Sequence, residues 1–288
     1  DLHLLSRRQR QMCIRDSIDV DLHECMMLKA IQTTLAKNKE NNDMSLYDWY
    51  AKALSDNKQI LQRITNVLVA DSAFSKKPFI DNMLGIGFNV VSRLRHDAAL
   101  YYLWEGDPTG KPGRPRVKGE KIDFKNIDKS KVAILDTDES NGQVYALKAW
   151  CKSLHRKISL VIHILPKGGH RLYFSTDESM SGRDVMEYYC TRFQIEFCFR
   201  DAKQFVGLTD SQARDTRKLD FAFNSSFTAV NVAKIMCSEY NLSIGRLKDL
   251  IINAYYAQRI IDVFENNPNT QLNHEIVNEI FGFAADAA

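Results

Sequence analysis

The spacing of apolar residues changes along the chain, and each change predicts a different element. Ile18, Val20 and Leu22 alternate with polar residues, which is the period of a half-buried strand, and we expect this strand within residues 18–33. Ser45 is a candidate N-cap, because apolar residues at helical spacing follow it and resume through residue 64. The first part of the chain therefore predicts a strand followed by a helix.

A strand, a helix and a second strand are predicted next. VLVAD at residues 67–71 is a short apolar run that ends in a carboxylate, which is typical of a buried parallel strand that brings Asp71 to the edge of a sheet. Asp71 has a second interpretation, as the cap of the turn that follows. Apolar residues between Phe79 and Leu84 predict a helix, and GFNVVSRL predicts the next strand. This order indicates an α/β core.

The pattern then changes to one rich in β-forming residues. Between residues 95 and 174, the runs KVAIL, GQVYALKAW, KISLVIHIL and HRLYF predict strands. A basic linker, GDPTGKPGRPRVKGEK, precedes them and is either a contact to a DNA backbone or a solvated flexible loop. Trp104 either stacks on an unpaired base or packs in a hairpin.

Helical spacing returns after residue 203. We expect helices over residues 217–240, 243–264 and 271–281, with polar breaks between them. The residues expected in their core are Phe221, Phe223, Phe227, Val230 and Ile235.

Residues 189–203, YCTRFQIEFCFRDAK, combine an apolar anchor with charged residues. They contain neither proline nor glycine and predict one uninterrupted helix. The polar residues that fall within an arc of roughly 60° on a regular helix are Tyr189, Arg192, Glu196 and Lys203. This stripe is either a solvated face with an Arg–Glu pair, or a site in which Glu196 binds a divalent ion and its neighbours bind phosphate.

Composition and charge narrow the class of protein. With 288 residues, 44% of them hydrophobic, the chain can bury a sizeable core. It has no run of about 18 apolar residues, and its six cysteines include no C-x-x-C pair, which favours reduced thiols in a cytoplasmic protein. The seven histidines lack zinc-ligand spacing. A net charge of +3 is too small to indicate nucleic acid by itself.

The opening segment, DLHLLSRRQRQMCIRDS, has an unusual composition. It contains four arginines and two aspartates, and this excess of positive charge fits a basic arm for DNA. It also resembles translated sequencing-adapter sequence, and we interpret residues 1–17 as non-native and exclude them from the fold prediction. On this interpretation the native chain begins near Ile18 and lacks its upstream part.

The spacing within residues 189–203 resembles a known motif. Y-x-x-R-x-x-x-E, six residues and then K match Tyr189, Arg192, Glu196 and Lys203, as in the YREK motif of DDE transposases of the insertion-sequence-4 type. The similarity continues through RFQIEFCFRDAKQFVGL and through LVADSAFSKKPF, which contains Asp71 and resembles the region of the second aspartate in that family.

The resemblance implies a fold class and a domain organisation. The fold is α/β, with a ribonuclease-H-like catalytic core that is interrupted by a β-rich insertion and followed by C-terminal helices. In this sequence the core occupies residues 18–94 and 176–240, the insertion residues 95–175, and the C-terminal helical region residues 241–288.

The resemblance also implies a metal-dependent reaction. Two ions, Mg²⁺ or Mn²⁺, about 4 Å apart would be held by three carboxylates, of which Asp71 and Glu196 match two. The first aspartate belongs on the first strand of such a core. Asp19 and Asp21 lie on what resembles the third strand and are poor substitutes. We therefore expect this chain to be catalytically inactive or nearly so.

The partners implied by the resemblance are DNA and a second copy of the chain. Members move an insertion element by hydrolysis and strand transfer at its terminal inverted repeats, as a homodimer in the bacterial nucleoid. Phosphate contacts are expected from Tyr189, Arg192 and Lys203, and secondary DNA contacts from Arg214, Arg217, Lys218 and Trp104. Two alternatives stay open: a non-catalytic DNA-binding remnant, and a ribonuclease-H-like nuclease without strand transfer.

Overall fold

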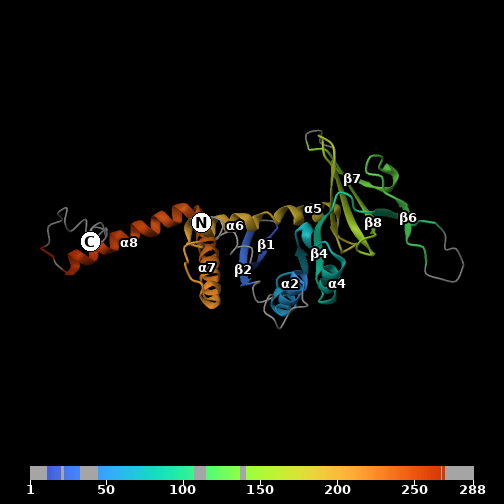
Figure 1. Ribbon diagram of the computed structural model, residues 1–288. Coiled ribbons are helices and arrows are strands. Elements are labelled where there is room, and N and C mark those ends of the chain that lie inside the picture. The colour runs from blue at the N-terminus through green and yellow to red at the C-terminus, as the bar shows by residue number, and fades with distance from the viewer. Residues whose placement is uncertain are drawn as a thin grey trace. The chain divides into compact units, whose positions relative to one another are not determined.

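The computed structural model describes residues 12–20, 23–32, 45–106, 115–136, 141–266 and 268–269. The chain forms two compact units that divide between Glu196 and Phe197. The first combines strands and helices, and the described part of the second is helical (Figure 1). Among the described residues, no helix combines the length and the apolar content needed to cross a membrane.

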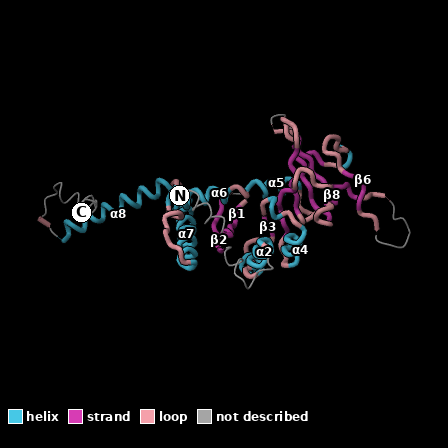
Figure 2. The backbone as a smooth tube through the Cα atoms, viewed as in Figure 1, coloured by secondary structure: helices cyan, strands magenta, loops and turns pink. Residues whose placement is uncertain are grey.

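A sheet of eight strands organises the first unit (Figure 2). The strand order is β3-β4-β10-β9-β8-β5-β6, and β7 pairs with β8 beside this path. β3 runs parallel to β4, whereas the other described pairs of this sheet are antiparallel. The strands are β3 (Val67–Val69), β4 (Asn89–Leu94), β5 (Leu100–Leu103), β6 (Lys118–Lys121), β7 (Ala133–Asp136), β8 (Gln143–Cys151), β9 (Arg156–Ile164) and β10 (His170–Ser175).

Helices cover both faces of this sheet. α2 (Leu46–Ser55), α3 (Lys58–Leu61) and α4 (Lys77–Gly85) belong to one face, and α5 (Gly182–Thr191) to the other. Successive strand residues point to opposite faces, so Val90 packs in the core that contains Ile80 of α4, whereas Val91 packs in the core that contains Val185 of α5. The apolar runs predicted as strands are continuous because both faces are buried.

The predicted elements between residues 45 and 94 are confirmed, except that the helix expected to resume through residue 64 ends at Leu61, the last residue of α3. α2 begins after Ser45, whose hydroxyl accepts a hydrogen bond from the Asp48 N–H, while the Asp48 carboxylate accepts one from the Ser45 N–H. β3, α4 and β4 follow in the predicted order. The mixed α/β class with C-terminal helices is also confirmed.

The strands predicted between residues 95 and 174 continue the same sheet as β3 and β4. β10 pairs directly with β4, and Leu172 opposite Leu94 begins their register. Arg116 and the residues after it in the basic linker are described, whereas Lys111 and Arg114 lie outside the described residues. The division of this unit into a core and an insertion stays a prediction.

A separate two-stranded sheet precedes α2. β1 (Met12–Asp19) pairs antiparallel with β2 (Glu24–Gln32), with an irregularity between Arg15 and Asp16. The segment expected as one strand within residues 18–33 therefore contains the end of β1 and the whole of β2, and Leu22 lies outside the described residues. β1 starts inside the segment interpreted as non-native, so residue 17 is not an element boundary.

Long helices make up most of the described part of the second unit. α6 (Gln194–Phe205) spans the division of the units, and α7 (Thr216–Tyr240) and α8 (Ile244–Asn266) confirm two of the three predicted helices. The third, at residues 271–281, lies outside the described residues. Phe223, Phe227 and Val230 are buried as predicted. Phe221 and Ile235 are 74% and 59% exposed, so their assignment to the core is wrong, because α7 carries apolar residues on more than one face.

Candidate active site

Asp71 lies just beyond the end of β3, as the sequence predicts. The ladder to β4 closes at Ala70, whose N–H donates to the Val91 carbonyl (3.0 Å). Asp71 Oδ1 then accepts a hydrogen bond from the Ser72 N–H (2.6 Å) and caps the short 3-10 helix η3 (Ser72–Phe74). The carboxylate is exposed. Asp71 is therefore a cap in this structure, and its role as a metal ligand stays a prediction.

Ser92 holds the backbone of Asp71 in place from the neighbouring strand. Ser92 lies on β4 and is fully buried. Its hydroxyl donates to the Asp71 carbonyl (3.2 Å) and lies 2.8 Å from the hydroxyl of Ser75, which donates to the Arg93 carbonyl. This network ties the turn after β3 to β4, so the position of Asp71 is set by two strands.

The motif segment is not one uninterrupted helix, and this prediction is wrong. α5 ends at Thr191 and α6 begins at Gln194. Between them the Arg192 N–H donates to the Tyr189 carbonyl, and the Glu196 N–H to the Phe193 carbonyl, which are bonds of a 3-10 turn. The 60° arc of a regular helix therefore does not apply across residues 192–193.

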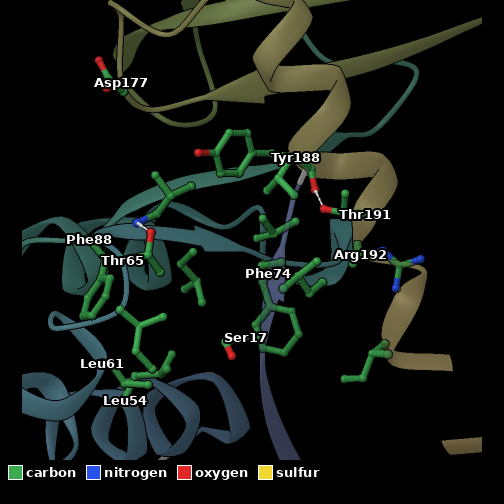
Figure 3. Close-up of a pocket in the computed structure, with 18 of the residues that line it drawn as sticks. Ser17, Leu54, Leu61, Thr65, Phe74, Phe88, Asp177, Tyr188, Thr191 and Arg192 are labelled. Atoms are coloured by element: carbon green, nitrogen blue, oxygen red, sulfur yellow. Dashed lines mark hydrogen bonds between the residues drawn. The ribbon is translucent and has the colours of Figure 1, made fainter. Parts of the chain in front are cut away.

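The hydroxyl of Thr191 provides the physical reason for the break. It donates to the Tyr188 carbonyl (2.8 Å), the group that would accept the Arg192 N–H in a regular α-helix (Figure 3). A threonine side chain competes in this way with the backbone, which favours a bend. Thr191 is buried, so water does not compete for its hydroxyl.

Tyr189 packs on the sheet, and nearby charges change the pKa of its phenol. Its ring lies 5.0 Å from that of Tyr173 on β10. Burial is the main reason that the pKa of the Tyr189 phenol is raised; the Arg192 charge opposes this rise, the Asp71 carboxylate adds to it, and Arg93 opposes it. The four side chains therefore belong to one electrostatic environment.

Arg192 is the C-cap of α5, and its charged side chain lacks one hydrogen-bond partner within the described part of the chain. Its guanidinium carbon lies 5.8 Å from the centre of the Tyr189 ring. Its Nε is buried and has no hydrogen-bond partner among the described residues. A buried donor of a charged group favours an anion that can accept its hydrogen bond.

The other two motif residues lie on α6. Glu196 is exposed in the first turn of this helix, where the positive end of the helix dipole favours a carboxylate. Lys203 is exposed in the last turn, about two helical turns further on.

A cavity of about 1040 Å³ opens beside β3 in the first unit. Figure 3 shows its lower side formed by Leu54 and Leu61, and its upper side by Tyr188 and Thr191. Asp71, Arg192 and Ile195 also line it. The predicted residues Asp71 and Arg192 thus line the same cavity. Glu196 is the next residue in the sequence after Ile195, a third residue that lines it.

Comparison with known protein families decides the class of this protein. The family described as transposase DDE domain matches residues 46–232, which contain Asp71, all four motif residues and the cavity-lining part of α5. The chain belongs to the transposase DDE domain family. Membership implies a nuclease function related to transposition, and the family normally uses divalent metal ions. A search among curated proteins found no match.

The acidic residues of this transposase domain fit such an ion only in part. Asp71 and Glu196 offer carboxylate oxygens, which suit hard divalent ions. However, the described residues include no group of three His, Cys, Asp or Glu side chains placed to hold a metal ion. They therefore do not form a complete metal site.

Trp104, one of the predicted DNA contacts, lies far from Asp71 in the order of the strands. It follows β5, near the edge of the sheet opposite to β3. Its ring is covered by the guanidinium of Arg116 at 3.9 Å, and the backbone N–H of Trp104 donates to the Val117 carbonyl. These contacts favour the hairpin-packing interpretation.

The remaining predicted DNA contacts belong to the second unit of the transposase domain. Arg217 and Lys218 open α7, where the Asp215 carboxylate accepts hydrogen bonds from both of their N–H groups. Arg214 lies in the preceding loop, and all three basic side chains are exposed. Their contact with DNA stays a prediction.

Two residues were missed by the sequence analysis, one beside Asp71 and one beside Tyr189. Ser92 positions the Asp71 backbone, and Arg93 lies close enough to Tyr189 to lower its pKa. Both are polar residues in a strand, NVVSRL, whose other residues are mostly apolar. These polar positions were the feature of the sequence that could have identified them. The proximity of Ser92 to Asp71 depends on the pairing of β3 with β4, which no local pattern reveals.

Proposed function

We propose that this chain is a DDE transposase of the insertion-sequence-4 type, which cuts and joins DNA at the ends of a bacterial insertion element. The observation that carries the proposal is that Asp71 and Arg192 line one cavity, together with Ile195, the residue before Glu196. A carboxylate and a guanidinium that face one cavity suit a site that binds a metal ion and a phosphate. Family membership supports the same class.

The residues have distinct roles in this proposal. Asp71 and Glu196 are ligands of Mg²⁺ or Mn²⁺ within a ribonuclease-H-like core. Tyr189, Arg192 and Lys203 bind phosphate near the cleaved end, and the unpartnered Nε of Arg192 is the donor with the clearest need for an anion. The inverted repeats, the target DNA and a second copy of the chain are the partners, in the cytoplasm.

The carboxylates of this chain limit its activity in the proposed reaction. Because the described residues hold no group of three potential ligands, no catalytic step through a metal ion can be assigned to them. We propose that the chain by itself has two of the three carboxylates and is inactive or nearly so. This favours a second candidate function, that of a DNA-binding remnant of a transposase.

A nicking assay tests the activity of the chain. A supercoiled plasmid that carries the terminal repeats of the element is incubated with the chain and Mg²⁺, and nicks are counted against a protein-free control. We expect nicking at the background level. Nicking that Glu196→Ala abolishes would contradict the proposed inactivity, and joined products would separate a transposase from a nuclease that only hydrolyses.

A binding assay tests the DNA contacts independently of catalysis. Arg192→Gln removes one cation, so we expect weaker binding to a duplex that ends in the terminal repeat, and a salt dependence of log K less steep by about 1. Lys167→Gln is the matched control, since Lys167 is an exposed lysine in the turn between β9 and β10. Equal binding by the two variants would refute the role of Arg192.

A further inference from the structure

A row of four side chains crosses the sheet on strands other than the one that leads to Asp71. Tyr101 of β5 pairs directly with Lys121 of β6 and with Trp150 of β8. Trp150 in turn pairs with Lys157 of β9. Directly paired residues of neighbouring strands point to the same face of a sheet. This row, which we call the aromatic row, therefore places two aromatic rings between two lysines.

The aromatic row lies on a part of the sheet that α5 does not follow. Tyr102, Ala149 and Ile158, each a sequence neighbour of a residue in the row, pack in the core on the α4 side. Because strand residues alternate, the row points to the opposite face. On that face α5 begins beside Ala146 of β8 and runs over β9, β10 and β4. Trp150 lies four residues further along β8, about 13 Å away.

Further lysines surround the row. The Nζ of Lys118 lies 5.8 Å from the centre of the Tyr101 ring and 5.7 Å from that of Trp150. Lys148 precedes Trp150 by two residues on β8 and therefore points to the same face. These lysines are exposed, and none of them forms an ion pair with another described residue: Lys118, Lys121, Lys148 and Lys157. Four such charges on one face favour a polyanion as the partner.

Trp150 adds a hydrogen-bond donor at the centre of these charges. Its side chain is 9% exposed, and its indole Nε1 is buried without a hydrogen-bond partner in the described part of the chain. A buried donor without an acceptor is unfavourable, which favours a ligand that brings an oxygen atom to it. The ring is too buried to stack on a base, so the phosphates of a nucleic acid fit this surface better than its bases do.

We propose that the aromatic row and the lysines around it form a second DNA-binding surface, which holds the phosphate backbone of a duplex without reading its sequence. The choice of DNA rests on the proposed function. From β6 to β9 the row crosses three strand spacings, about 14 Å, which equals the rise of about four base pairs. The lysines neutralise phosphates along this length, and the indole N–H of Trp150 donates to a phosphate oxygen.

Binding of a duplex without free ends tests this surface. The probe is a fluorescent duplex of about 20 base pairs that lacks the terminal repeat and is closed by a hairpin loop at each end. Lys148→Gln combined with Lys157→Gln removes two cations. We expect this variant to bind about tenfold more weakly at low salt, with a salt dependence of log K less steep by about 2.

The matched control also removes two cations. It combines Lys52→Gln on α2 with Lys167→Gln in the turn between β9 and β10, two exposed positions away from the row. This control should bind the closed duplex like the parent. Binding like the parent by the variant at Lys148 and Lys157, or an equal loss in the control, would overturn the proposal.

The indole of Trp150 gives a readout that a general loss of charge would not move. In NMR spectra its N–H resonance should shift when the closed duplex is added, whereas that of Trp49, buried on α2, should stay in place. Trp150→Phe keeps a ring but removes the N–H, so binding should weaken about fivefold, as for one lost hydrogen bond. If this variant does not fold, the resonance of the parent still decides. An unmoved Trp150 resonance at saturating duplex would overturn the proposal.

Failure of this surface and failure of the proposed function are distinguishable. The closed duplex offers neither a free end nor a terminal repeat, so its binding does not measure the contacts of Arg192 near a cleaved end. The role of Arg192 fails if Arg192→Gln binds the terminal repeat like the parent. The second surface fails if replacement of Lys148 and Lys157 leaves binding of the closed duplex unchanged. Either result can occur without the other.

Discussion

The buried hydroxyl of Ser92 donates a hydrogen bond to the backbone carbonyl of Asp71 across the β3–β4 pair, at 3.2 Å. Asp71 therefore reaches the cavity from a turn that is fixed on two sides, by its own cap on Ser72 and by the neighbouring strand. A site residue on a mobile loop would be placed less reliably, because ligand geometry depends on locked supports.

Replacing this serine tests the support. In Ser92→Ala the Asp71 carbonyl and the Ser75 hydroxyl each lose a partner, so we expect the free energy of unfolding to fall by about 1–2 kcal/mol. Urea unfolding measures this change. Ser238→Ala, at an exposed position of α7, is the control and should change stability by less than about 0.5 kcal/mol. Equal effects of both substitutions would mean that the Ser92 contact contributes nothing.

The pKa of Tyr189 should respond in opposite directions to two substitutions. Asp71→Asn removes a negative charge that raises this pKa, so the pKa should fall, whereas Arg192→Gln removes a positive charge that lowers it, so the pKa should rise. Both shifts are measured by NMR titration of the labelled phenol carbon. Two shifts of the same sign would show that the three side chains do not share one environment.

The raised pKa of Tyr189 also predicts a dependence of stability on pH. The folded chain holds the phenol proton more tightly than the unfolded chain, whose tyrosine has a pKa of 10.0. The contribution of Tyr189 is therefore fully present below pH 10 and is lost as the pH rises through the folded pKa. Unfolding of the parent and of Tyr189→Phe is compared between pH 8 and pH 11. The stability advantage of the parent should shrink above about pH 10, and a constant difference would refute the shift.

Lys203 offers a second test of phosphate contact. It is exposed in the last turn of α6, so its replacement should not disturb a core. If it binds phosphate, Lys203→Gln should reduce the salt slope of DNA binding by about 1 and leave the unfolding midpoint unchanged. The control is Lys125→Gln, since Lys125 is exposed in the turn after β6. A slope that is the same in both variants would remove Lys203 from the site.

Trp104 is expected to stabilise the fold and not to bind DNA. Its ring lies under the Arg116 guanidinium, so Trp104→Ala should cost about 1–2 kcal/mol of stability through lost packing and the lost cation–π contact. Trp104→Phe keeps an aromatic ring and should lose less. Binding of single-stranded DNA should be equal in the parent and in folded Trp104→Ala, which has no ring to stack, and a clear loss would restore the stacking hypothesis.

Some of this molecule follows from local sequence alone. The cap at Ser45, the strand that ends before Asp71, the strand runs of β8 and β9 and the two long helices α7 and α8 are each encoded within a short window, because apolar period and capping chemistry are local properties. The coarser part of the family prediction, a DDE transposase domain, is also confirmed for residues 46–232, whereas the insertion-sequence-4 type and the YREK motif stay predictions.

Other features were decided only by tertiary structure. The Thr191 hydroxyl divides the motif segment into α5 and α6, although the sequence lacks proline and glycine there, because a buried side chain competes for the Tyr188 carbonyl. The pairing of β3 with β4 brings Ser92 to Asp71, and residues of β3 line the cavity. These relationships join residues that are distant in sequence, and only the packing of strands and helices creates them.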